Sequence, residues 1–81
     1  MNEVTHARLQ EVLLSLGFSY NGIYRKNKIF RHDETGAMVI YPESAPDDAV
    51  LPRHLFAVET ILDAYGLADP EGFTLELHRA S

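Results

Sequence analysis

Apolar side chains recur at helical spacing near the start of the chain. Four of them fall at i, i+3, i+4 and i+7, which is one stripe of an amphipathic helix: Leu9, Val12, Leu13 and Leu16. Thr5 or Asn2 can cap the start, because either side chain can accept a hydrogen bond from a free backbone N–H. Gly17 followed by Phe18 is typical of a helix end. We predict a helix over residues 4–16.

A second helical stripe follows Pro52, which suits the first position of a helix because its missing N–H would be unpaired there. Its apolar positions are spaced at i, i+4, i+7, i+11 and i+14: Leu51, Leu55, Val58, Leu62 and Tyr65. Gly66-Leu67 closes this stripe as Gly17-Phe18 closes the first one. The second helix is therefore expected to end near Tyr65.

The region between the two stripes has the pattern of β-structure. Asn21-Gly22 supplies the two positive-φ residues of a type I′ turn, which is the strongest short signal for a hairpin. A polar turn at 33–36 and a loop at 42–50 separate the remaining segments, and Pro42 ends the last of them. Three strands are predicted, over residues 18–20, 24–32 and 37–41.

The chain closes with an alternating segment. Three apolar residues alternate with polar ones, which predicts a short half-buried strand over residues 73–78: Phe73, Leu75 and Leu77. The fold class is therefore α+β, with α-β-β-β-α order in a two-layer sandwich and an extra C-terminal strand. Both helices must cover one face of the sheet, because nothing else can bury their stripes. The other face is then free for contact.

The register of the two clearer strands leaves two alternatives open. If Phe30 lies across from Val39 and both face the core, then Asn27, Ile29 and the arginines point outward. If Ile29 and Ile40 face the core, the assignment reverses. We favour the first, because it exposes two arginines and buries the bulkier side chains.

Composition narrows the class of protein. The chain has 81 residues, 46% of them hydrophobic, so residues 1–81 are expected to form a single globular domain. It has no cysteine, which excludes a disulfide scaffold and a thiolate metal site. The longest apolar run, Ala37–Tyr41, is too short to cross a membrane, and no secretory signal is visible. A cytoplasmic location is expected.

The net charge of −5 conceals an asymmetry. Residues 1–41 hold five Lys/Arg against four Asp/Glu, whereas residues 42–81 hold two against eight. Within 24–32 there are four basic residues and no acid. An acidic total argues against general nucleic-acid binding, but the short basic segment keeps a small RNA contact open.

No pattern for metal or cofactor chemistry is present. The four histidines lie in separate segments without the i, i+4 spacing of a helical metal site: His6, His32, His54 and His78. We expect them on the surface. The serines lie outside a nucleophile elbow, and the glycines are isolated rather than grouped in a phosphate-binding loop. No metal and no cofactor is predicted.

The basic segment is the strongest candidate for binding. It combines cations, which pair with phosphates, with aromatic faces, which stack on bases, and an amide, which can read base edges. The RNA-binding candidates are Arg25, Lys26, Asn27, Lys28 and Arg31.

The sequence resembles the HicA family of small bacterial toxins, whose fold is similar to a double-stranded-RNA-binding domain. The resemblance covers about residues 5–67. It rests on four matched stretches: Leu16-Gly17-Phe18, the run from Arg25 to His32, Val39-Ile40-Tyr41-Pro42, and the second helix with its Gly66-Leu67 exit. It implies RNA cleavage and a HicB-like antitoxin as protein partner.

The match departs from the family at the catalytic position. The first histidine of the family's run, which the resemblance implies to be the catalyst, corresponds to Asn27. An amide has no pKa near neutrality and cannot shuttle a proton as imidazole does. His32 remains from the run and is a weak candidate catalyst for a residual RNase. No catalytic residue is predicted.

The sequence therefore favours a degenerate, HicA-like RNA-binding domain of a toxin–antitoxin type system that lacks mRNA interferase activity. The alternative is a non-catalytic protein-interaction module that acts through its acidic half or its exposed sheet. A homodimer fits either function. A sheet edge near 73–78 could pair with another chain.

Overall fold

A computed structural model describes residues 3–79. The elements are, in chain order, α1 (His6–Ser15), β1 (Phe18–Tyr24), β2 (Asn27–His32), β3 (Met38–Pro42), α2 (Pro52–Ala64) and α3 (Pro70–His78). The chain is thus a small α+β domain, as expected, but it ends in a third helix.

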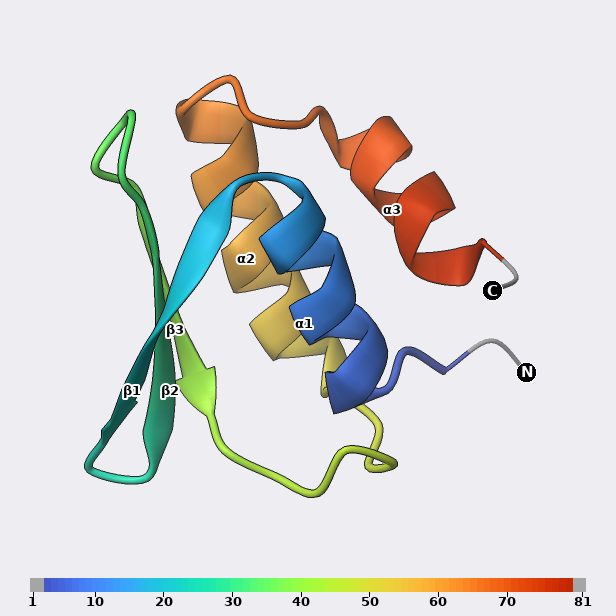
Figure 1. Ribbon diagram of the computed structural model, residues 1–81. Coiled ribbons are helices and arrows are strands. Elements are labelled where there is room, and N and C mark those ends of the chain that lie inside the picture. Colours follow the sequence, from blue (N-terminus) through green and yellow to red (C-terminus); the bar gives the residue numbers. More distant parts are fainter. Residues whose placement is uncertain (1–2, 80–81) are drawn as a thin grey trace.

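The three strands form one antiparallel sheet in the order β1-β2-β3. Helices α1 and α2 both pack on one face of this sheet, α1 against β1 and α2 against β3, and the opposite face is uncovered by any described element (Figure 1). Helix α3 packs against α1 and α2 on the side away from the sheet (Figure 1). The prediction that both helices cover one face is therefore confirmed.

The first helix begins and ends where its local signals place it. The Thr5 hydroxyl oxygen accepts a hydrogen bond from the Arg8 backbone N–H at 3.1 Å, which is an N-cap. Gly17 follows the helix with a φ of +100°, a conformation that strongly favours glycine.

The second helix ends in a similar way. At its C-terminus the Leu67 N–H donates to the Leu62 carbonyl at 2.9 Å, so that Gly66-Leu67 folds back over the last turn. Both helix predictions are confirmed to within about two residues.

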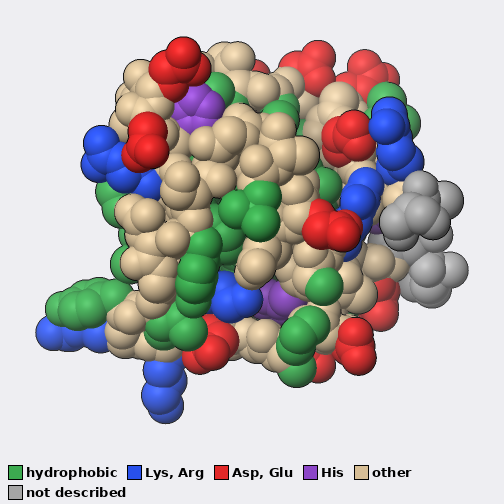
Figure 2. All heavy atoms as spheres, viewed as in Figure 1, with side chains coloured by type: hydrophobic (Ala, Val, Ile, Leu, Met, Phe, Trp, Pro, Cys, Tyr) green, Lys and Arg blue, Asp and Glu red, His purple; other side chains and the backbone are tan. Residues whose placement is uncertain are grey.

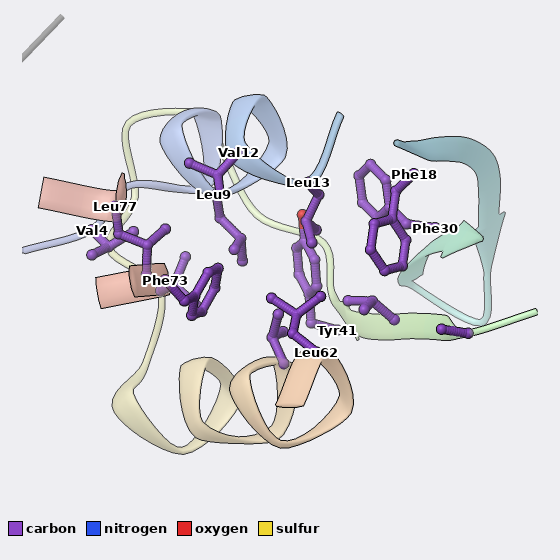
Figure 3. Close-up of a cluster of buried hydrophobic side chains, with 14 residues drawn as sticks. Val4, Leu9, Val12, Leu13, Phe18, Phe30, Tyr41, Leu62, Phe73 and Leu77 are labelled. Atoms are coloured by element: carbon purple, nitrogen blue, oxygen red, sulfur yellow. The ribbon is translucent and has the colours of Figure 1, made fainter. Parts of the chain in front are cut away.

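The core lies between the inner face of the sheet and the helices. Figure 3 shows side chains from the helices and from the strands meeting there. Phe30 and Tyr41 stack with ring centroids 5.7 Å apart. Phe30 pairs with Val39 across β2 and β3, and both are buried. The favoured register is therefore confirmed.

The first hairpin turns at a different place from the predicted one. Tyr24 pairs with Asn27, so the two-residue turn is Arg25-Lys26. Asn21-Gly22 instead lies inside β1, where the register shifts by one residue between Tyr20 and Ile23. This is a β-bulge. The later turn is favoured because it allows a longer stretch of β1 to pair with β2. It also brings the ring centroids of Tyr20 and Phe30 to 5.3 Å from each other.

The predicted C-terminal strand is wrong, because residues 70–78 form α3. The Asp69 carboxylate accepts from the Gly72 N–H at 2.7 Å and caps the helix, and Pro70 occupies its first turn. Phe73 and Leu77 are buried one helical turn apart, whereas Leu75 is 69% exposed. Residues i and i+4 share one face in a helix as well as in a strand, so Phe73 and Leu77 fit either structure, and the cap decides between them. The expected sheet edge near 73–78 does not exist.

The loop between β3 and α2 is held against the start of α1. The His6 N–H donates to the Asp48 carbonyl at 2.9 Å, and the Val50 N–H donates to the Val4 carbonyl at 2.7 Å. The acidic loop is therefore fixed beside the helix rather than extended into solvent.

Candidate nucleic-acid interface

The tip of the β1–β2 hairpin carries two of the predicted RNA-binding residues. Arg25 and Lys26 form the turn itself, with φ values of +53° and +68°. Two positive φ values in a two-residue loop are the geometry of a type I′ turn, in which Asn and Gly are preferred. A long cationic side chain in this conformation costs about 1–2 kcal/mol per residue.

The side chains around this turn make it a projecting basic and aromatic surface. The Arg25 guanidinium lies 5.2 Å from the centroid of the Tyr24 ring, and Tyr24 is 61% exposed. Figure 2 shows Lys/Arg and hydrophobic side chains projecting together at the lower left, where Figure 1 places the hairpin. Tyr24, Arg25 and Lys26 are called the hairpin tip below.

Asn27 lies beside the hairpin tip and helps to hold its shape. Its amide Nδ2 donates to the Arg25 carbonyl at 3.1 Å across the turn. The Lys26 carbonyl accepts from the Glu43 N–H at 2.8 Å, which ties the turn to the end of β3. Asn27 therefore serves as a turn residue, although its side chain stays half-exposed next to the cations.

The other two predicted cations lie apart from the tip, on opposite faces of β2. Lys28 pairs with Tyr41, so it points to the inner face, where its Nζ donates to Gln10 Oε1 at 3.1 Å. Arg31 pairs with Met38 on the outer face, and its Nε lies 3.3 Å from the Asp33 carboxylate. The structure thus gathers Arg25, Lys26 and Asn27, and separates Lys28 and Arg31 from them.

His32, the weak catalytic candidate, is buried in a structural position. Its Nδ1 lies 3.3 Å from the Thr35 N–H and 3.0 Å from the Thr35 hydroxyl, in the turn after β2. Its ring packs edge-on against Phe18 at 5.3 Å. A side chain added at Gly17 would come within 3.1 Å of its Nε2. The imidazole therefore fills the junction of α1 and the sheet, away from the hairpin tip.

His6 is a second buried histidine, and its sequence context does not predict its burial. His6 and Tyr41 are both buried, with ring centroids 5.7 Å apart, and neither His6 Nδ1 nor the Tyr41 hydroxyl has a hydrogen-bond partner within residues 3–79. The expectation that the histidines lie on the surface is therefore wrong for His6 and His32. It holds for His78 and in part for His54. Burial of a polar residue on an apolar helix stripe leaves no signal in the sequence.

Burial and charge both act on this pair. Burial lowers the pKa of His6 below its ordinary value, and the nearby Lys28 ammonium lowers it further, whereas Asp48 raises it. Burial raises the pKa of Tyr41 to about 12. Both groups are therefore held in their neutral forms at neutral pH.

The acidic loop has a structural role of its own. The Asp48 carboxylate accepts hydrogen bonds from the Ser44 hydroxyl and, at 3.2 Å, from the Ala45 N–H. These bonds lower the pKa of Asp48. The carboxylate closes a turn rather than facing a second acid across a cleft, so the loop does not have the geometry of an acid–base pair.

Among the described residues, no group of three or more His, Asp or Glu side chains lies close enough together to hold a metal ion. None of the helices in residues 3–79 has the length and apolar character needed to cross a bilayer. Comparisons with protein-family models, with curated proteins and with solved structures find no match to this chain. The hairpin tip and the surfaces around it are therefore the features that bear on function.

Proposed function

We propose that this chain is a HicA-like RNA-binding domain of a toxin–antitoxin type system, which contacts RNA through the hairpin tip and does not cleave it. The observation that carries the proposal is the Arg25-Lys26 turn. The chain has an Asn-Gly pair that suits a type I′ turn, yet that pair lies in a bulge and two cations occupy the strained turn. Such strain is typical of functional positions.

The chemistry of the tip suits a phosphate backbone. Two cations project from the body of the molecule without an acidic side chain in a salt bridge to either, within residues 3–79. The neighbouring Tyr24 ring can stack on an unpaired base, and the Asn27 amide can contact a base edge or a ribose hydroxyl.

The element order from α1 to α2 is the α-β-β-β-α order that the HicA resemblance implies. Helix α3 comes after it, outside the resemblance. The order supports the family proposal, and the hairpin tip supplies the surface that would contact RNA.

Cleavage is not part of the proposal, because neither candidate position offers a proton-transfer group to a bound phosphate. The Asn27 amide does not titrate near neutral pH. His32 is buried and engaged by Thr35. The tip can therefore bind a phosphate but has no general base beside it.

The charge of the chain sets the expected strength of binding. A tip with two cations on a molecule of net charge −5 neutralises only a few phosphates. We expect weak binding that is lost as salt rises, with a shallow dependence on salt concentration, because each phosphate contact contributes about 0.7–0.9 to the slope.

The test is fluorescence anisotropy of a short labelled RNA hairpin at low salt. Replacing Arg25 and Lys26 by Ala should weaken binding by about tenfold or more, because each cation loses a charge-assisted contact. The matched control is the replacement of Arg53 and Arg79 by Ala, which removes the same charge from exposed positions on α2 and beyond α3. Equal losses in the two double variants would contradict a contact at the tip.

A second candidate function rests on the uncovered face of the sheet. That face presents four apolar or aromatic side chains: Tyr24, Ile29, Met38 and Ile40. A protein-interaction module would use it, and a HicB-like antitoxin is the partner that the resemblance implies. Co-purification of a small protein encoded by the neighbouring gene, together with no affinity for RNA, would favour this function over the first.

A further inference from the structure

The two edges of the sheet are protected differently. The edge strand β1 contains the bulge at Asn21-Gly22, a feature that disrupts pairing with a further strand. The other edge strand, β3, pairs with β2 in an unbroken register. Residues 35–42 contain no charged side chain, in a chain of which 23% is charged. The common safeguards against edge pairing that β3 has are Pro42, at its end, and its length of five residues.

The backbone of β3 presents unpaired groups to this open edge. The His32 N–H donates to the Ala37 carbonyl at 2.9 Å, and the Glu43 N–H donates to the Lys26 carbonyl at 2.8 Å. These two bonds show which residues of β3 form hydrogen bonds with β2, because hydrogen-bonded and non-hydrogen-bonded pairs alternate along antiparallel strands. Val39 and Tyr41 therefore bond to β2, and the N–H and C=O groups of Met38 and Ile40 point away from it. In residues 3–79, no bond from another segment reaches them.

The side chains around this edge are apolar. Met38 is 42% exposed and Ile40 is 54% exposed. A groove of about 260 Å³ runs beside them between β3 and α2, and all its lining side chains are apolar: Met38, Val39, Ile40, Ala57, Val58 and Ile61. An extended chain paired to β3 would therefore find both hydrogen-bond partners and an apolar groove.

We infer that β3 pairs with β3 of a second copy of this chain. A two-fold axis perpendicular to the sheet sets Val39 of one copy opposite Val39 of the other, and Met38 opposite Ile40. This register forms four backbone hydrogen bonds across the axis, because each Met38–Ile40 pair exchanges two. The two three-stranded sheets join into one of six strands, and α2 of each copy lies beside the axis.

The lack of charge at this edge allows a second copy of the acidic chain to approach it. Each chain carries a net charge of −5, so two copies repel over most of their surfaces, and a contact between them needs a region without charge. Residues 35–42 and the groove provide that region. The partner strand is also already ordered in the second copy, whereas a disordered peptide would lose conformational entropy on binding.

The size of the contact predicts a weak dimer. A stable interface of standard size buries about 800 Å² on each partner, roughly a seventh of the 5280 Å² surface of this chain. A five-residue strand and one groove are smaller than that. We expect a dissociation constant on the order of 10–100 µM. The dimer does not depend on RNA binding and is tested without RNA.

Sedimentation velocity of the full chain from about 1 µM to 1 mM should show the monomer converting to a dimer. Ile40→Pro removes only an N–H that points away from β2, so it should leave a folded monomer at all concentrations. The matched control Ile40→Val keeps that donor and should still form the dimer.

A charged variant gives a second test. Met38→Lys should abolish the dimer by placing a charge at the apolar edge, and Leu75→Lys, which adds the same charge on the exposed face of α3, should leave it intact. Circular dichroism checks that each variant is folded. A wild-type chain that stays monomeric at 1 mM would overturn the inference, as would a dimer that survives both Met38→Lys and a folded Ile40→Pro.

Discussion

His6 shows how one buried side chain makes the stability of the fold depend on pH. Its ring lies between the first turn of α1 and Tyr41 on the inner face of the sheet. Burial is the largest cause of its lowered pKa, followed by the charge of Lys28. The folded chain therefore holds His6 neutral where the unfolded chain, with a pKa near 6.5, begins to take up a proton.

The sign of the effect follows from proton linkage. As pH falls below about 6.5, the unfolded state binds more protons than the folded state, so the free energy of unfolding decreases. This contribution is complete above the unfolded pKa and is lost as pH falls through the folded pKa. We predict that the melting temperature of the wild type drops between pH 7.5 and about 5.

His6→Phe removes the titrating group and should flatten this part of the profile, as measured by thermal unfolding at a series of pH values. His78→Phe is the control, because His78 is exposed and its replacement should leave the dependence in place. A His6→Phe profile as steep as that of the wild type would show that another group causes it.

Among the elements, local signals place α1 and α2 but not the hairpin. The caps at Thr5 and Gly17 act within one turn of the ends of α1, so the sequence alone predicts where this helix begins and ends. The turn at Arg25-Lys26 depends on the pairing of whole strands. A turn at Arg25-Lys26 does not use the dipeptide Asn21-Gly22, which favours a type I′ turn. It instead pairs Phe18 with His32 and Tyr20 with Phe30. No local sequence pattern indicates that this pairing is preferred.

The candidate site was predicted as a set of residues but not as a surface. The five predicted positions lie in one basic segment, but in the structure the turn and the alternation of β2 place them in three directions. A strand read as starting at Tyr24 places Arg25 on a face of the sheet, whereas in the structure it lies in the turn. The position of the turn therefore decides which cations can act together.

Helix α3 provides a direct test of helix against strand at the C-terminus. In the helix Leu77 is buried and Leu75 is exposed, whereas a strand would place both on one face. We predict that Leu77→Ala lowers the free energy of unfolding by about 2–3 kcal/mol. Leu75→Ala should change it by less than about 0.5 kcal/mol.

Chemical denaturation of the two variants measures this difference, and the wild type is the reference for both. Equal losses for Leu75→Ala and Leu77→Ala would contradict the helix.

Over the whole molecule, the charge is distributed unevenly among three surfaces. The hairpin tip is basic, the β3 edge is neutral, and the loop after β3 together with α2 and α3 carries most of the acids. The net charge of −5 describes none of these surfaces. A small basic tip on an acidic body favours an oriented, limited contact with RNA over binding along a long polyanion.

Under the proposed function, two cations occupy a strained turn because they contact RNA. Arg25→Asn together with Lys26→Gly installs the residues that a type I′ turn prefers. This change should raise the free energy of unfolding by about 1 kcal/mol, since it relieves the positive-φ strain, and raise the melting temperature by about 4–8 °C. The same protein should lose most of its affinity for RNA.

Thermal unfolding and RNA anisotropy of this one double variant separate the strain of the turn from its contact with RNA. Arg53→Asn with Arg79→Gly is the control for the loss of two charges, and it should not gain stability. We expect a more stable protein that no longer binds RNA at low salt. A double variant that gains stability and binds RNA as tightly as the wild type would contradict this expectation.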